Sequence, residues 1–353
     1  MSRRATVVGV GLIGGSIGMA LREEGWHVNG VDTDEGRLLE AQKLGSIDKV
    51  GWDALSEITF VATPVGVIPK LVKKALQVSP NGFVTDVGGV KDSIVKSIKD
   101  PRFVGGHPMA GSEQEGLVGA NSSMFSDANW VLTPNENTGD EAFARVREIV
   151  TSIGAETVTL SPDRHDSLVA MVSHVPHLTA ATLMGLASTR SEEHFAVLRL
   201  AAGGFRDMTR IAAGNPQIWP DVCDNNQEAI VKVIDELVKA LGEVRSEIIT
   251  SDKEALLHRL ETAKQARITL PTGAPKASEL IEVRVAILDR RGELATIASL
   301  ATELDVNIFD LEIAHSSEGD RGVVVLLVEK ELAERLAGGL ITQGYRPVLR
   351  PLV

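Results

Sequence analysis

Cysteine and positive charge are both scarce in this sequence of 353 residues. Cys223 is the only cysteine, which excludes an internal disulfide framework and a zinc site built on several thiolates. Lysine and arginine number 36 against 48 aspartate and glutamate residues, so the formal net charge is −12. A chain of that charge repels nucleic acids and anionic membranes unless basic groups gather locally, and we expect neither as a partner.

Long apolar runs are missing as well. The apolar stretch near the N-terminus is broken by glycines and leads into the polar run Arg22, Glu23 and Glu24, without the small-residue cleavage site of a signal peptide. No other stretch approaches the roughly 18 uninterrupted apolar residues of a membrane-spanning helix. With 43% hydrophobic and 24% charged residues, the composition is typical of soluble globular chains, and we expect a cytoplasmic protein of two or three domains.

Residues 1–161 alternate short β-branched runs with helical segments. Strands are expected at residues 5–9, 28–31, 58–62, 83–87, 103–105, 130–132 and 156–160, and helices at 13–24, 35–44, 67–76 and 141–153. Apolar strands that alternate with helices predict an α/β fold, a Rossmann-type doubly wound sheet of parallel strands.

Strand signals vanish between residues 162 and 268, where the sequence becomes rich in alanine, leucine and glutamate. We expect an all-helical domain, with helices at 178–186, at 192–200 and along the amphipathic stretch 227–266. The length of that last stretch favours a homodimer surface, because homodimers are the commonest soluble assemblies. A solvated helix packed on its own domain would show the same pattern.

Two prolines and a glycine predict a linker at residues 269–277. Residues 278–353 then carry strand signals at 279–288, 308–314, 322–328 and 347–352, and helical signals at 294–304 and 330–342. The order β-α-β-β-α-β in about 75 residues is typical of a ferredoxin-like module.

A glycine-rich turn follows the first predicted strand and opens the first predicted helix. It consists of Gly9, Val10, Gly11, Leu12, Ile13 and Gly14. Such a G-x-G-x-x-G turn brings the backbone close to a pyrophosphate at a helix N-terminus, so it predicts a dinucleotide site. Asp32 ends the next strand, where its carboxylate would bind ribose hydroxyls and repel a 2′-phosphate, which favours NAD over NADP. Asp32 could instead cap the following helix, and Arg37 lies nearby.

Two predicted loops at the carboxyl ends of strands carry further candidates, because open α/β sheets bind ligands at that edge. Thr63, Pro64 and Val65 form the first, which we expect beside the nicotinamide, although Pro64 could simply end its strand. His107 lies in the second, between glycines that let a substrate approach. A neutral imidazole there could accept a proton from an alcohol whose carbon loses a hydride, although a loop histidine bonded to the backbone would look the same.

Histidines and arginines of the helical region are candidates for substrate binding. His174 and His177 would share a helix face, but no carboxylate or thiolate lies at ligand spacing beside them. We therefore expect no metal, and place one of the pair against a substrate. Arg206 and Arg210 would also share a face, with Asp207 between them. Arginine suits a carboxylate, and a chain of this charge needs local cations to hold an anion, although a surface Asp–Arg pair is the alternative.

Together these motifs resemble the prephenate dehydrogenase family over essentially the whole chain. The resemblance is carried by GVGLIGGS (9–16), VATPV (61–65), TDVGGVK (85–91), GGHPMAGSEQEG (105–116), SHVPH (173–177) and GGFRDMTRIAAGNPQIW (203–219). The tail resembles an ACT regulatory domain, with Asp289, Arg290, Arg291 and Gly292 before its first helix. Asp305, Val306, Asn307 and Ile308 follow that helix.

The resemblance implies an activity and roles for these residues. Family members oxidatively decarboxylate prephenate to 4-hydroxyphenylpyruvate with NAD, on the way to tyrosine, and some use arogenate instead. His107 would accept the proton of the C4 hydroxyl, and Arg210 would anchor a substrate carboxylate. The other implied substrate residues are Glu113, Ser173, His177, Asp207 and Trp219. Gly89 departs from the family, whose members often carry a serine there that is implied to bond the catalytic histidine or the substrate hydroxyl.

An ACT tail implies an amino-acid effector, for which tyrosine is the first candidate. The implied effector residues are Arg291, Gly292, Asn307 and Ile308. A tail that serves only dimerisation is the alternative. For the whole chain, a β-hydroxyacid dehydrogenase has the same two-domain plan but usually relies on a lysine with no obvious counterpart here. A non-catalytic regulator that binds NAD and an amino acid would leave His107 and Arg210 idle.

Overall fold

The computed structural model describes residues 3–111, 114, 116–193, 199–269, 280–288, 290, 292–315 and 321–351. The predictions for Glu113, Arg291, most of the 269–277 linker and part of the 192–200 helix lie outside these residues. The chain divides into two compact units, Met1–Ser246 and Glu247–Val353. Composition places the linker later, at 269–277, and that linker stays a prediction.

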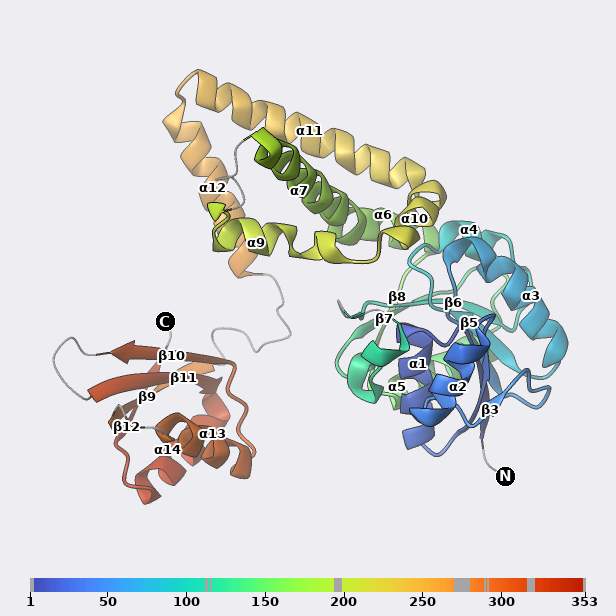
Figure 1. The fold of residues 1–353 in the computed structure, drawn as a ribbon, viewed down its shortest axis with the longest axis horizontal. Coiled ribbons are helices and arrows are strands. Elements are labelled where there is room, and N and C mark those ends of the chain that lie inside the picture. Colours follow the sequence, from blue (N-terminus) through green and yellow to red (C-terminus); the bar gives the residue numbers. More distant parts are fainter. Residues whose placement is uncertain are drawn as a thin grey trace. The chain divides into compact units, whose positions relative to one another are not determined.

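An eight-stranded sheet forms the centre of the first unit (Figure 1). Its strands are β1 (Arg4–Val8), β2 (His27–Val31), β3 (Lys49–Val50), β4 (Ile58–Val61), β5 (Phe83–Asp86), β6 (Phe103–Pro108), β7 (Asn129–Thr133) and β8 (Glu156–Thr159). They lie in the order β3-β2-β1-β4-β5-β6-β7-β8. The six strands β1 to β6 run parallel, which confirms the Rossmann-type sheet.

The last two strands depart from the all-parallel prediction. β7 pairs antiparallel with β6, and β8 runs parallel to β7. A parallel neighbour requires a long crossover, usually a helix, whereas the segment between β6 and β7 contains the short 3₁₀ turns Leu117–Gly119 and Ser122–Phe125. The chain therefore turns back beside β6, the strand that carries His107.

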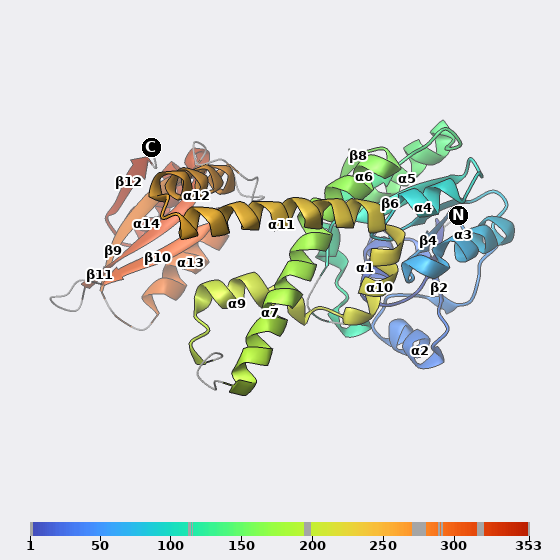
Figure 2. The same cartoon turned by 90° about the horizontal axis from the view of Figure 1, so that it is seen from above.

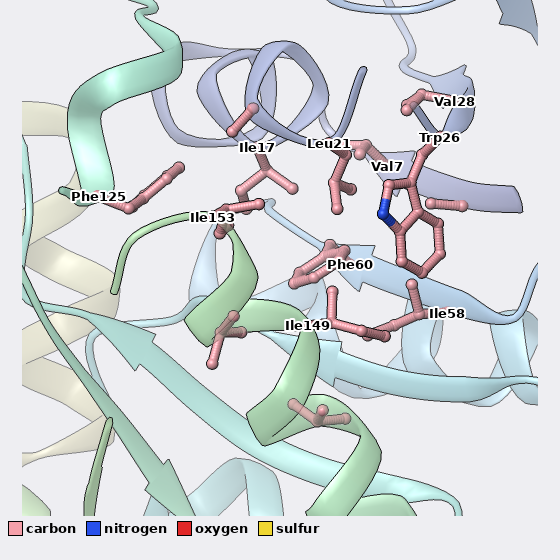
Figure 3. Packing of buried hydrophobic residues seen from close by; sticks show 14 of the residues in the cluster. Val7, Ile17, Leu21, Trp26, Val28, Ile58, Phe60, Phe125, Ile149 and Ile153 are labelled. Atoms are coloured by element: carbon pink, nitrogen blue, oxygen red, sulfur yellow. The ribbon is translucent and has the colours of Figure 1, made fainter. Parts of the chain in front are cut away.

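Helices pack on the two faces of this sheet in separate apolar clusters. α1 (Leu12–Glu23), α2 (Glu35–Lys43) and α5 (Asp140–Ser152) contribute to one, and α3 (Ile68–Val78) and α4 (Asp92–Lys96) contribute to the other. In Figure 3, Leu21 of α1, Phe60 of β4 and Ile149 of α5 meet near Trp26, and each is at most 3% exposed. Truncation of Phe60 to alanine would cost about 3–5 kcal/mol of unfolding free energy. This packing holds the N-terminus of α1 at the carboxyl edge of the sheet.

The rest of the first unit is helical, as predicted. It contains α6 (Pro162–Val169), a π-helical turn (Ala170–His174), α7 (Val175–Glu193), α9 (Gly203–Thr209), α10 (Trp219–Asn225) and most of α11 (Gln227–Ile249). Its own apolar cluster is small and centres on Ala170, Val175, Ile230 and Val233. Figure 2 shows α7 and α11 as two long helices that diverge from a shared end, and Leu186, Val238 and Leu241 on them are 58%, 62% and 57% exposed.

The continuous helical stretch Pro162–Arg190 has the length and composition of a membrane span, and it is the one such stretch in the described part of the chain. It is interrupted by polar groups, however, since Ser173, His174 and His177 lie near its middle. Length and composition alone are weak support for membrane insertion, because the apolar helices of soluble proteins share both.

The second unit begins in α11 and contains α12 (Lys253–Ile268) and a four-stranded antiparallel sheet. Its other elements are β9 (Leu280–Leu288), α13 (Glu293–Glu303), β10 (Asp310–His315), β11 (Arg321–Glu329), α14 (Lys330–Thr342) and β12 (Pro347–Pro351). The strands lie in the order β10-β11-β9-β12, and the chain follows the predicted β-α-β-β-α-β sequence. Val285 and Leu326 of the sheet and Leu336 of α14 are fully buried together.

Candidate active site

The glycine turn after β1 leaves open space in front of α1. Gly9 has a φ of +88°, and a Cβ there would lie 2.2 Å from the carbonyl oxygen of Ala62. A Cβ on Gly14 would lie 1.9 Å from the carbonyl oxygen of Gly9, so glycine alone fits these positions. No described atom lies within 4 Å of the position that a Cβ on Gly11 would take, and Gly11 is the N-cap of α1. The amides of the first helical turn therefore face a space that suits an anion.

Asp32 lies beside this turn at the end of β2. Its Oδ2 accepts a hydrogen bond from the Val10 amide and its Oδ1 accepts one from the Asp34 amide, both at 3.0 Å. Asp34 is the N-cap of α2, since its side chain accepts the Arg37 amide at 3.1 Å, so the interpretation of Asp32 as the helix cap is wrong. Arg37 Nη1 lies 3.5 Å from Asp32 Oδ2. The carboxylate thus occupies the position from which it could bind ribose hydroxyls.

The loop Thr63, Pro64 and Val65 follows β4 at the same edge of the sheet. Pro64 is the N-cap of a 3₁₀ turn, and Val65 is buried. The Thr63 hydroxyl is buried and has no hydrogen-bond partner within the described chain. Because a buried hydroxyl without a partner is costly, a bound ligand is a reasonable acceptor or donor for it.

His107 lies within β6 rather than in the loop after a strand, because β6 extends to Pro108 through its pairing with β7. Its Nδ1 lies 2.9 Å from Nε2 of His165, and the two rings meet edge to face at 5.1 Å. Its Nε2 faces the other way, toward Gly89, where a Cβ would lie at 3.8 Å. One ring nitrogen is therefore committed to His165 and the other lies on the side of Gly89.

His165 and Asp166 are functional candidates that the sequence motifs did not indicate. His165 Nδ1 lies 2.7 Å from Asp166 Oδ1, and both side chains are buried at the start of the helical region. The Asp166 carboxylate also accepts the backbone amides of Lys91 at 2.8 Å and Asp92 at 2.9 Å. The dipeptide is adjacent to His107 only because α6 packs against α4, and this long-range contact leaves no local signal.

A fully buried ion pair between Lys91 and Asp86 lies beneath the strand that carries His107. Lys91 Nζ also donates to the carbonyl oxygen of Gly106 at 2.8 Å, and Asp86 accepts the amides of Gly88 and Gly106. These bonds fix the backbone directly before His107. Because the loss of one partner would leave a buried charge unpaired, either truncation would cost about 3–5 kcal/mol of stability.

The electrostatic surroundings keep His107 uncharged near neutral pH. Burial is the main cause that lowers the pKa of His107 well below its usual value, and the electrostatic influence of the neighbouring His165, Lys91 and His174 lowers it further. Burial likewise lowers the pKa of His174 to about 4, against the opposing effect of Asp166. A neutral imidazole at position 107 can accept a proton.

The predicted substrate residues of the helical region join this network through Asn226. Asn226 Nδ2 donates to the backbone oxygen of Asp166 at 2.9 Å and lies 3.2 Å from His174 Nδ1. His174 meets the ring of Trp219 edge to face at 6.1 Å, and His177 stacks on Trp219 at 3.8 Å. A chain of contacts thus connects His107 to His177, although 70 positions separate them in the sequence.

The remaining predicted residues have varied surroundings. Ser173 lies in the π-helical turn and is half-buried. Asp207 and Arg210 are exposed at the end of α9, which packs against α7, the helix of His177. His174 and His177 contact Asn226 and Trp219, and no group of three potential metal ligands occurs among the described residues.

The effector residues belong to the second unit. Gly292 has a φ of +96° and is the N-cap of α13, with no side-chain hydrogen bond to the helix. Asn307 and Ile308 lie between α13 and β10. Nearby, Tyr345 Oη donates to Glu293 Oε2 at 2.7 Å, and this bond raises the pKa of Tyr345 to about 12.

A parallel sheet that carries a dinucleotide turn and, on another strand, an uncharged histidine, followed by a helical region, is the arrangement of a two-domain dehydrogenase. The family model of the prephenate dehydrogenase nucleotide-binding domain matches residues 17–159, and that of the prephenate dehydrogenase dimerization domain matches residues 161–262. The chain belongs to the prephenate dehydrogenase family of oxidoreductases.

Individual relatives agree with this assignment. A prephenate dehydrogenase of Bacillus subtilis is 30% identical over 333 residues, which cover 90% of each chain. A solved prephenate dehydrogenase from A. aeolicus, in complex with hydroxyphenyl propionate and NAD+, is 29% identical, with a TM-score of 0.71 over 76% of this chain and 98% of that one. A Synechocystis arogenate dehydrogenase is 30% identical, with a TM-score of 0.65 over 75% and 98%.

Proposed function

We propose that this protein oxidatively decarboxylates prephenate to 4-hydroxyphenylpyruvate with NAD. The observation that carries the proposal is His107, an uncharged imidazole whose Nε2 is free of the His165 contact and lies at the carboxyl edge of the dinucleotide-binding sheet. Two curated relatives named prephenate dehydrogenase, each 30% identical over about 90% of both chains, support prephenate as the substrate.

The residues at the glycine turn fit NAD. The space before Gly11 and the amides of α1 suit the pyrophosphate, and the Asp32 carboxylate suits the ribose hydroxyls. The buried Thr63 hydroxyl would find its missing partner in the nicotinamide half. When bound, NAD supplies an acceptor for the hydride that leaves C4 of the substrate ring.

His107 would accept the proton of the substrate's C4 hydroxyl and later return it. Its Nε2 accepts the proton of the C4 hydroxyl as that carbon loses its hydride. The ring carboxylate then leaves as CO₂, its bonding electrons enter the ring, and the ring becomes aromatic. The overall reaction releases no net proton, so His107 returns its proton to the oxygen and is ready for another cycle.

Side chains of the helical region would bind the rest of the substrate. Arg210 is proposed to anchor a carboxylate, with Asp207 and Glu113 in an ionic network around it. Ser173, His177 and Trp219 would line the pocket, and the stacking of His177 on Trp219 supports this placement by ordering both rings.

Assembly and regulation complete the proposal. The proposed protein is a cytoplasmic homodimer, and the exposed apolar side chains of α7 and α11 and the dimerization-domain match support the dimer. We infer that the β-α-β-β-α-β module is an ACT domain in which tyrosine binds near Gly292, Asn307 and Ile308, and inhibits the enzyme. The uncapped N-terminus of α13 supports a carboxylate ligand there.

Steady-state rates with each substrate and each cofactor test this proposal. We expect NADH to form from prephenate and NAD, with lower kcat/KM for arogenate and for NADP. Preference for arogenate would keep the reaction class but replace the substrate, a possibility that the similar Synechocystis arogenate dehydrogenase makes worth measuring. No NADH from either compound would overturn the proposal.

A further inference from the structure

The Asp166 carboxylate determines which nitrogen of His165 carries a proton. Its two oxygens accept backbone N–H groups from Lys91 and Asp92, which can only donate. Its third partner, His165 Nδ1 at 2.7 Å, therefore donates as well. The side chains of His165 and Asp166 are 0% and 6% exposed, so water does not compete strongly for these bonds.

The position of the ring proton on His165 then determines which nitrogen of His107 carries a proton. When His165 carries one ring proton, on Nδ1, the lone pair of its Nε2 lies 2.9 Å from His107 Nδ1. His107 must donate its Nδ1 proton there, so its own lone pair is on Nε2. We propose that His165 and Asp166 are positioning residues that hold His107 in the tautomer able to accept the substrate proton.

The same chain of bonds would stabilise His107 after it accepts that proton. The imidazolium keeps its Nδ1–H bond to His165, and the Asp166 carboxylate lies behind His165. The other charged or titratable groups around His107 are Lys91, which is paired with Asp86, and His174, whose low pKa keeps it neutral near pH 7. Asp166 is thus the anion that stabilises the His107 imidazolium, through its hydrogen bond to His165.

The position of His165 is also fixed from the helical side. Asn226 donates to the backbone oxygen of Asp166, and the Asp166 side chain bonds the segment before α4. The ring at position 165 is therefore held by both structural parts of the first unit. This inference rests on the proposed role of His107 as base, but the tautomer can be measured without turnover.

Two substitutions of His165 separate the bonds that it makes. His165→Asn places an amide nitrogen near the position of Nδ1, so it retains the bond to Asp166 but ends short of His107. His165→Gln places an amide oxygen near the position of Nε2, where it can accept the His107 Nδ1 proton. We expect His165→Asn to lower kcat about 100-fold and His165→Gln to stay within about tenfold of wild type. KM for prephenate and Kd for NAD should change less than about threefold in both.

The tautomer itself is measured by ¹⁵N NMR of the His107 ring in the full-length protein. We expect a protonated Nδ1 and an unprotonated Nε2 in wild type and His165→Gln, and a mixture of tautomers in His165→Asn and Asp166→Asn. A proton on Nε2 of wild-type His107 would overturn the proposal. So would equal losses of kcat in both His165 variants, or wild-type kcat in His165→Asn.

The proposed function fails by a different result. If wild type turns over neither prephenate nor arogenate, His107 is not the base of that reaction, whatever its tautomer. If wild type is active but the tautomer or the variants disagree with the expectations above, the function stands and the positioning roles of His165 and Asp166 do not.

Discussion

At the scale of single residues, glycine at position 89 leaves space beside His107. A Cβ there would lie 3.8 Å from His107 Nε2, an ordinary van der Waals contact, so a small side chain fits. We predict that Gly89→Ser folds normally and raises kcat about threefold to tenfold. The serine hydroxyl would add one hydrogen bond to His107 or to the substrate hydroxyl, and such a bond contributes about 0.5–1.5 kcal/mol. Gly89→Ala is the matched control and should keep wild-type kcat. A lower kcat in Gly89→Ser than in Gly89→Ala would show that the hydroxyl competes for Nε2.

His174 gives the stability of the protein a pH dependence. Its pKa is about 4 in the folded chain because of burial, against 6.5 ordinarily. The unfolded chain therefore binds a proton at His174 more readily than the folded chain does. The contribution of neutral His174 to the free energy of unfolding is complete above pH 6.5 and is lost as the pH falls toward 4. The full difference is about 3 kcal/mol. Urea unfolding should show a smaller loss between pH 7 and pH 4.5 in His174→Gln than in wild type, and equal losses would contradict this origin.

Residue types and spacing led to His107 and His177, and the family resemblance added Trp219, which is in contact with His177. They did not lead to His165, Asp166 or the buried Lys91. Lys91 is part of a recognised motif, but its burial depends on tertiary contacts, since its Nζ donates to the carbonyl oxygen of Gly106 in β6. Residues that work through tertiary contacts have no periodicity or spacing to reveal them.

At the scale of elements, the turn between β1 and α1 contains one glycine that folding requires, Gly14, and one that cofactor binding requires, Gly11. A Cβ at Gly14 would collide with the Gly9 carbonyl at 1.9 Å, whereas one at Gly11 meets no described atom within 4 Å. We predict that Gly14→Ala lowers the melting temperature by several degrees. Gly11→Ala should leave melting unchanged and weaken NAD binding at least tenfold, measured by calorimetry, because its methyl enters the pyrophosphate space. If Gly11→Ala bound NAD as tightly as wild type, NAD would not bind at this turn.

Element boundaries were predictable to within a few residues wherever periodicity was strong, as for α14 and β9. The extension of β6 through His107 was not, because it comes from pairing with β7 rather than from strand-forming residues. The two glycines before His107 weaken the local strand signal. The break between α11 and α12 depends on Ser251, whose φ of +56° no sequence pattern indicated.

At the scale of the whole molecule, the proposed ACT domain should transmit the tyrosine signal. We predict that tyrosine inhibits the full chain, and that a shortened chain ending near Thr272 retains activity but loses that inhibition. Initial rates against tyrosine concentration test both expectations. Equal tyrosine sensitivity of the two chains would mean that tyrosine competes at the active site, and the β-α-β-β-α-β module would lose its regulatory role.

The central claim is that His107 accepts the substrate proton in an NAD-dependent oxidation of prephenate. The direct test is the rate of NADH formation from prephenate and NAD by wild type and by His107→Asn, each measured from pH 5 to pH 9. We predict a kcat about 10²–10⁴ lower in His107→Asn with unchanged NAD affinity. Wild-type kcat/KM should fall only below pH 6.5, because the pKa of His107 is lowered by burial. Full turnover by His107→Asn at neutral pH would contradict the account.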